Sequence, residues 1–145
     1  MQTFEKISWE IGEDLRQRLG GAVEAEICQK AILYLLKTPT ERLEMLSLSS
    51  LNDALDRQYE REQLLRSLQI LSGSWLDLLE VFFKYYDEVR DEEIDVELES
   101  VSDAEESGQF IHPATGMPID NYRNNLFMYF GASKKLRDMK SRLHA

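Results

Sequence analysis

The sequence lacks the residues that cross-link or anchor a secreted or membrane protein. It has a single cysteine, Cys28, so no disulfide can form within the chain, as is usual in a reducing compartment. No stretch approaches the roughly 20 apolar residues that span a bilayer. The N-terminus shows no basic region followed by an apolar one, which a secretion signal would have. We therefore expect a soluble, cytoplasmic protein with no membrane partner.

Catalytic and cofactor motifs are lacking as well. There is no phosphate-binding loop, dinucleotide fingerprint, paired-cysteine zinc spacing or serine elbow. Cys28 lies in an apolar run and is expected to be buried, and His112, which precedes a proline, is expected to form hydrogen bonds within its loop. The alternating acids from Asp91 to Glu97 have neither the glycine nor the flanking helices of a calcium-binding loop. We predict that the chain is not an enzyme and holds no metal or cofactor.

Acidic charge is abundant, and it is unevenly placed along a chain whose net charge is −10. Residues 87–106 carry 11 acidic and 1 basic side chains, residues 1–86 carry 14 acidic and 10 basic, and residues 107–145 carry 2 acidic and 6 basic. Such a run of like charge is usually a solvated hairpin or loop. The alternative is a contact surface for a basic partner. Both interpretations oppose nucleic-acid binding, in which Lys and Arg neutralise phosphates.

Apolar spacing predicts helices in the first half of a single domain of 145 residues. Apolar residues recur every three or four positions over residues 3–19, 22–37 and 59–71. A short helix is expected to start from a cap at Ser49 or Ser50. Residues 41–48 fit either a last helical turn or a short strand.

In one segment of the second half of the chain, apolar residues alternate with polar ones and do not recur at helical spacing. Ile94, Val96 and Leu98 alternate with acidic residues, which indicates a half-buried strand with one wet face. The aromatic run before it is the nearest partner, so we predict a hairpin of residues 79–87 with 92–99. The alternative is one long helix over residues 75–90.

The remaining segments complete the expected fold. Residues 102–107 fit a helical turn, residues 126–130 an edge strand or a buried plug, and residues 132–145 a basic C-terminal tail with helical spacing. The predicted fold class is α+β, mostly helical, with a two-stranded acidic hairpin and a C-terminal helix. An all-α bundle is the alternative.

The order of these elements resembles the winged-helix superfamily over residues 22–99. Helices over 22–37, 50–56 and 59–71 are followed by a hairpin over 79–99. The resemblance implies DNA contacts from the third helix and the wing. Here that helix would offer arginines interleaved with Glu60 and Glu62, and the wing would be acidic, so the charges depart from a DNA-binding pattern. Winged helices also serve as protein-docking modules, which these charges fit better.

Two functions follow as hypotheses. The first is a protein-interaction module, a small adaptor or regulatory subunit that binds a protein with a basic surface through acidic side chains and exposed aromatic ones: Tyr85, Tyr86, Glu93, Asp95, Glu97, Glu99 and Phe110. Its basic tail would pair with the acidic segment of a second copy in a homodimer. A secretion-type chaperone shares the small size and the acidity.

The second hypothesis is a DNA-binding transcriptional regulator of winged-helix type. Its contacts would come from the basic side chains of the third helix and of the tail: Arg57, Arg61, Arg66, Lys134, Lys135, Arg137, Lys140 and Arg142. The net negative charge argues against nucleic acid as the partner.

Overall fold

The computed structural model describes residues 3–144. Within these residues, six α-helices and a small antiparallel sheet make a mixed, mostly helical fold, which confirms the predicted α+β class and contradicts an all-α bundle. The chain forms two compact units. Of the described residues, unit 1 combines those up to Glu80 with those from Phe130 onward, and unit 2 is Val81–Tyr129.

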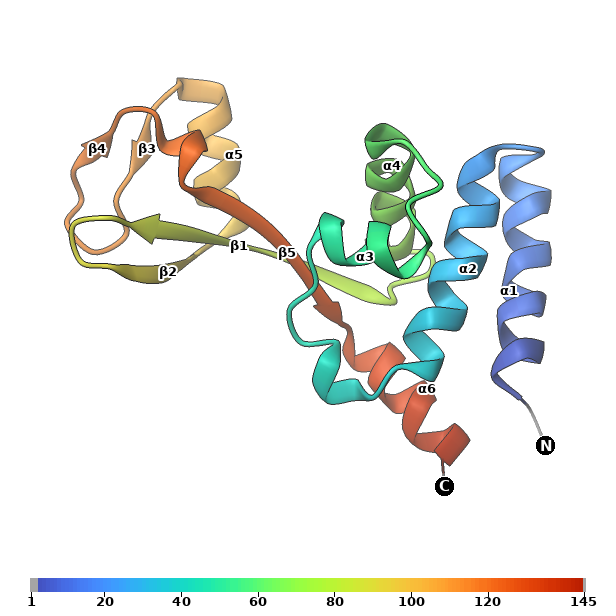
Figure 1. Ribbon diagram of the computed structural model, residues 1–145. Coiled ribbons are helices and arrows are strands. Elements are labelled where there is room, and N and C mark those ends of the chain that lie inside the picture. Colours follow the sequence, from blue (N-terminus) through green and yellow to red (C-terminus); the bar gives the residue numbers. More distant parts are fainter. Residues whose placement is uncertain (1–2, 145) are drawn as a thin grey trace. The chain divides into compact units, whose positions relative to one another are not determined.

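Two antiparallel helices begin unit 1 (Figure 1). Helix α1 (Phe4–Leu19) starts where the Thr3 side chain accepts a hydrogen bond from the backbone of Lys6, and it ends at Gly20 with a positive φ of 64°. Helix α2 (Val23–Lys37) is almost entirely apolar on its inner face, and Ile27, Cys28, Ala31, Ile32 and Leu36 are fully buried. The helices expected over 3–19 and 22–37 are therefore confirmed.

The segment after α2 combines both structures that its sequence allowed. A 3-10 turn, η1 (Thr40–Arg42), is followed by Leu46, which forms an isolated antiparallel bridge with Phe130. Helix α3 (Leu48–Ala54) then begins at Ser47, whose hydroxyl accepts from the backbone of Ser50 in a capping box. The predicted cap at Ser49 or Ser50 is wrong, because Ser47 is the serine with an extended backbone and a serine three residues later.

The aromatic run forms a strand, as predicted. Helix α4 (Arg61–Ser72) leads to β1 (Leu79–Asp87), which pairs antiparallel with β2 (Glu92–Val96). This hairpin excludes a helix over 75–90. It is shorter than predicted, because helix α5 (Leu98–Ser107) starts directly after it. Leu98, expected to face inward on a strand, is 62% exposed at the start of that helix.

Strand β5 (Leu126–Ala132) lies on the other side of β1, so the strand order is β2-β1-β5. The edge-strand interpretation of residues 126–130 is therefore confirmed. β1 carries the chain from unit 1 into unit 2, and β5 carries it back.

The core of unit 2 lies against one face of the hairpin. Besides α5 it draws on β3 (Phe110–Ile111), β4 (Pro118–Ile119) and the 3-10 turn η2 (Tyr122–Asn124). The aromatic rings of this core lie in a row, with centroids 5.2 Å apart for the tilted pair Tyr85 and Phe110 and 5.4 Å apart for the stacked pair Phe110 and Tyr122. Val101 and Ala104 of α5 complete the cluster.

The C-terminal helix α6 (Lys134–His144) packs into unit 1 and is not a free basic arm. Its Leu136 is fully buried, and Lys140 is 2% exposed. The Lys140 ammonium donates to the backbone oxygens of Leu35 and Leu36, at 2.6 and 2.9 Å, and so satisfies carbonyls at the end of α2. Burial lowers the pKa of Lys140. The expectation that Lys140 grips phosphate is therefore wrong.

Candidate functional site

The two faces of the β1–β2 hairpin differ in what covers them. Successive residues of a strand point to opposite faces. Tyr85 therefore faces the core and is 7% exposed, and its partner Phe110 is 0% exposed. The prediction that Tyr85 and Phe110 are exposed contact residues is wrong, because both rings form the core of unit 2. Tyr86, the next residue along β1, lies on the opposite face.

The opposite face gathers aromatic and acidic side chains from three strands. In the register of the hairpin, Tyr86 is opposite Glu93 and Lys84 is opposite Asp95. Phe82, two residues before Lys84, stacks on Tyr129 of β5 with ring centroids 6.0 Å apart. Phe127, two residues before Tyr129, is 44% exposed. We name this surface the aromatic–acidic face; it consists of Phe82, Lys84, Tyr86, Glu93, Asp95, Phe127 and Tyr129.

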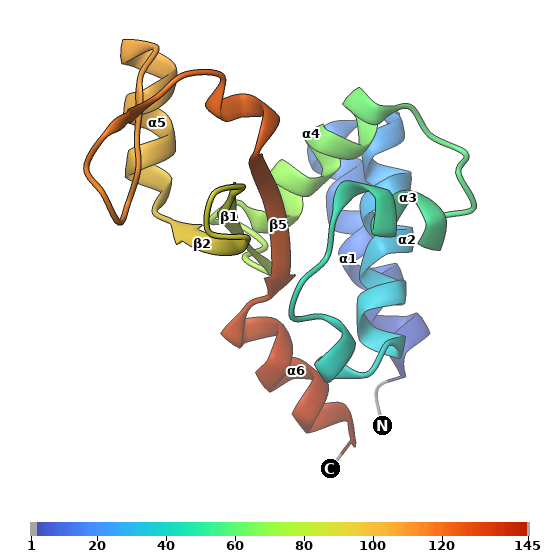
Figure 2. The ribbon, with the colours of Figure 1, turned by 60° about the vertical axis from the view of Figure 1, so that its left-hand side comes forward.

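Within unit 2 this face is uncovered. The buried side chains of α5, β3, β4 and η2 all belong to the cluster around Tyr85. Figure 1 shows α5, β3 and β4 on one side of the hairpin, and Figure 2 shows α5 there from a second direction. The sheet therefore presents four aromatic rings, each partly or substantially exposed, on its other side.

Sequence reasoning found only part of this surface. It proposed Tyr86, Glu93 and Asp95, which do share the face, but it missed Phe82, Phe127 and Tyr129. The alternation in residues 126–130 was a usable signal, because Phe127 and Tyr129 are two apart. What the sequence did not show is that β5 lies beside β1.

The carboxylates of the face differ in whether they are already paired. Asp95 lies 3.2 Å from the Lys84 ammonium, and its side chain is 88% exposed. Glu93 is exposed, and within the described residues it forms no ion pair. The Tyr86 hydroxyl donates to Asp91, and this hydrogen bond raises the pKa of Tyr86. Glu93 is therefore the carboxylate of the face that an incoming cation would meet unpaired.

Glu97 and Glu99, the other two predicted acidic contact residues, lie beside the face rather than on it. Glu97 is the N-cap residue of α5, and Glu99 lies in its first turn. Both are exposed, and an acid at a helix N-terminus is favoured by the helix dipole. They add negative charge next to β2 without belonging to the sheet.

A buried Asp–His pair lies at the end of β1. The His112 Nε2 atom is 2.7 Å from Oδ2 of Asp87, and both side chains are buried. The His112 Nδ1 atom accepts hydrogen bonds from the backbone of Ala114 and Thr115, so the proton of the ring is on Nε2 and is donated to Asp87. This hydrogen bond lowers the pKa of Asp87.

The hydrogen bonds of the Asp87–His112 pair fit a structural role and not a catalytic one. Both ring nitrogens of His112 are already used, so neither is free to take a proton from a substrate. The prediction that His112 bonds within its loop is confirmed.

Cys28, buried as predicted, donates to the Ser67 carbonyl, and burial raises its pKa to about 12. A thiol with such a pKa is not a nucleophile near neutral pH.

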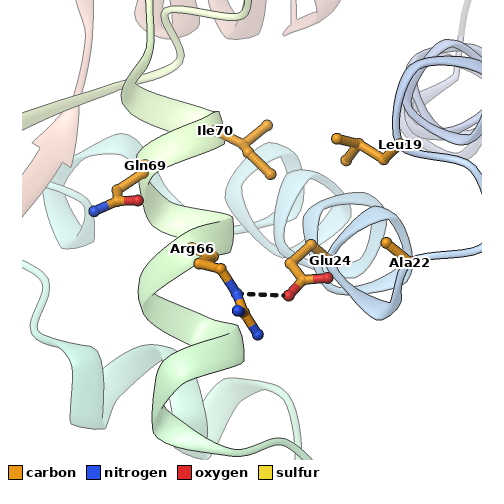
Figure 3. A pocket seen from close by; sticks show the side chains of 6 residues that line it. All are labelled: Leu19, Ala22, Glu24, Arg66, Gln69 and Ile70. Atoms are coloured by element: carbon orange, nitrogen blue, oxygen red, sulfur yellow. Dashed lines mark ion pairs between the residues drawn. The ribbon is translucent and has the colours of Figure 1, made fainter.

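A groove of about 630 Å³ opens on unit 1, between the start of α2 and α4 (Figure 3). Leu19 and Ile70 line its apolar end. At the other end the Nε atom of Arg66 lies 2.9 Å from Glu24. Arg66, predicted to contact DNA, is thus held by a carboxylate.

Apart from the buried Lys140, the other predicted DNA-contacting residues lie on the surface of unit 1, and several are likewise engaged. Arg57 pairs with Asp53 at 2.7 Å, and Lys134 lies 3.8 Å from Asp138. The Lys135 ammonium donates to the Leu76 carbonyl. Arg61 and Arg137 are exposed.

Comparison of the chain with protein-family models, curated proteins and solved structures finds no match. Among residues 3–144 no helix combines the length and the apolar character needed to cross a membrane. In the same residues, no three His, Cys, Asp or Glu side chains gather in a way that would hold a metal ion. Function must therefore be inferred from the surfaces of the chain itself.

Proposed function

We propose that this chain is a non-enzymatic protein-interaction module, a small adaptor or regulatory subunit of a cytoplasmic assembly, and that it binds a basic partner through the aromatic–acidic face. The observation that carries the proposal is the one-sided covering of the β1–β2 hairpin. Its core face is filled by Tyr85, Phe110 and Tyr122, while Tyr86 and Phe127 remain accessible on the other.

The chemistry of this face is that of a protein contact. Aromatic residues are enriched in the centres of protein interfaces and carry much of their binding energy. The acids of the hairpin supply a negative field, since Glu93 and Asp95 lie on the face and Glu97 and Glu99 lie next to β2. Such a field steers a basic protein toward the face and repels polyanions.

A non-catalytic role is supported by the state of the reactive side chains. His112 uses both ring nitrogens in hydrogen bonds, and the buried thiol of Cys28 has a raised pKa. A catalytic nucleophile and its base each need an accessible atom that can react with a substrate. The ring nitrogens of His112 and the thiol of Cys28 are instead engaged in contacts within the fold.

Binding of a labelled peptide that mixes lysine and arginine tests this proposal. We expect saturable binding that weakens as salt rises from about 50 to about 150 mM. Glu93→Lys should weaken it, whereas Glu10→Lys, an equal charge change at an exposed position of α1, should not. Equal loss in both variants would show that net charge alone, and not this face, attracts the peptide.

The alternative function, a winged-helix transcriptional regulator, is favoured by the order of the elements along the chain. Helix α2, the Leu46 bridge, α3, α4 and the β1–β2 hairpin follow one another in the order of that superfamily. In this interpretation the β1–β2 hairpin is the wing. Retardation of a DNA duplex at about 50 mM salt, lost in Arg61→Glu, would favour this function over protein binding.

In a homodimer, the basic partner of the face would be a second copy of this chain. The exposed cations of α6, such as Arg137, would meet the carboxylates of a second copy. Sedimentation equilibrium at low and moderate salt measures it, and dimerisation that weakens in Glu93→Lys would identify the face as the interface.

A further inference from the structure

We infer that the partner presents an extended segment with arginines at alternate positions, and that one guanidinium group stacks on Tyr86 and bonds to Glu93 while another stacks on Phe127. This inference rests on the proposed function and names the partner chemistry of the same face. It follows from the placement of rings and carboxylates on neighbouring strands.

The Tyr86 ring and the unpaired Glu93 carboxylate lie within reach of one cation. Tyr86 and Glu93 are directly opposite each other in the hairpin register, where facing side chains have Cβ atoms about 5 Å apart. A guanidinium lying on the Tyr86 ring therefore reaches the Glu93 carboxylate. One step along the strands, Lys84 already bonds to Asp95 at 3.2 Å, which shows how a cation sits on this surface.

Arginine fits this combination better than lysine does. A guanidinium is planar, weakly hydrated, stacks on aromatic faces and bonds to a carboxylate through two N–H groups at once. An ammonium is a compact, strongly hydrated charge that loses more hydration on a ring. The chain itself uses this contact in unit 1, where the Arg18 guanidinium lies 4.0 Å from the ring centroid of Trp75.

The strand spacing of the face favours an extended partner. The face is one side of a sheet, and side chains on one side of a strand recur about every 6.6 Å. An extended segment with arginine at every second position repeats at the same interval, so its cations match the rows of rings and acids. A helix would bring only every third or fourth residue to the face.

Single-stranded nucleic acid is the other ligand that stacks on aromatic sheet faces, and the charges here oppose it. Such platforms are lined with Lys and Arg that track the phosphates. This face has Lys84 alone, already paired with Asp95, beside the unpaired Glu93. The same carboxylates that repel phosphate attract guanidinium.

Two labelled peptides of equal length and charge test the inference, one alternating arginine with serine and the other lysine with serine. Fluorescence anisotropy with the full chain at about 50 mM salt should show the arginine peptide binding about tenfold more tightly. Tyr86→Leu and Phe127→Leu keep apolar bulk without a ring, and each should reduce that preference toward equality. Tyr86→Phe should keep it, and so should Trp9→Leu, which removes an exposed ring from α1.

The possible outcomes distinguish failure of the arginine inference from failure of the proposed function. Equal, salt-sensitive binding of both peptides, weakened in Glu93→Lys, leaves the basic partner in place and overturns the arginine inference. Absence of binding by either peptide overturns both. An arginine preference that survives in Tyr86→Leu and Phe127→Leu, with folding confirmed by circular dichroism, also overturns it, as does tighter binding of oligo-deoxythymidine than of the arginine peptide.

Discussion

The Nε2 atom of His112 donates to Oδ2 of Asp87 across 2.7 Å, and this contact ties the end of β1 to the turn between β3 and β4. Asp87 also accepts from the backbone of Val89 and Arg90 through its other oxygen. One carboxylate thus closes the β1–β2 hairpin and holds a second turn 25 residues away.

Asp87→Asn should lower the free energy of unfolding of unit 2 and make that free energy depend less on pH in the acidic range. The bond from His112 lowers the pKa of Asp87 below its usual 3.8, so its stabilising contribution is present above that pH and is lost as pH falls through the lower folded value. Urea unfolding measured between neutral pH and about pH 3 checks this. Asp103→Asn, at an exposed position of α5, is the control and should follow the parent protein.

Phe110→Ala and Phe127→Ala should differ sharply in stability although the substitution is the same. Phe110 is 0% exposed, and truncating it should cost about 3–5 kcal/mol of unfolding free energy through lost burial and a cavity. Phe127 is 44% exposed and should cost under about 1 kcal/mol. Similar losses in denaturant unfolding would contradict the assignment of the two faces.

Lys140→Met should destabilise unit 1 by about 1–3 kcal/mol, because the carbonyls at the end of α2 lose a buried donor. Lys134→Met removes the same charge from a side chain that is 83% exposed, and it should change stability by no more than about 0.5 kcal/mol. Thermal unfolding of the two variants provides the comparison. Equal effects would mean that charge, and not capping of α2, determines the loss.

Gly131→Ala should destabilise the protein by about 1–3 kcal/mol through overpacking. A Cβ atom there would lie 2.7 Å from the backbone oxygen of Glu44, which cannot move as a side chain can. This close approach accompanies the bridge between Leu46 and Phe130. Gly21→Ala is the matched control, since a Cβ there meets nothing within 4 Å. A stable Gly131→Ala variant would contradict the packing of β5 against this segment.

Local patterns predicted much of the secondary structure. The stripe over residues 3–19 corresponds to α1, and the alternation of Ile94 and Val96 marks β2, because helix and strand periods are visible along the chain. The alternation continues to Leu98, where the structure already begins α5. Because Leu98 continues the alternation, the pattern does not indicate that the next helix begins at this residue.

The functional surface was predictable only in part for the same reason. Tyr85 and Tyr86 are equivalent in composition, and only the packing of Phe110 onto Tyr85 makes one core and the other surface. Lys140 likewise resembles the other cations of its tail, yet it is the one that meets the end of α2.

The amino-acid sequence alone determined the segregation of charge, the helical and strand periods and the absence of known catalytic motifs, since these depend on residues close together in the chain. Tertiary structure decided which face of the hairpin stays open, that β5 adds Phe127 and Tyr129 to it, and that Asp87 meets His112. Those outcomes depend on contacts between residues far apart in sequence, where burial of one side chain is set by another segment.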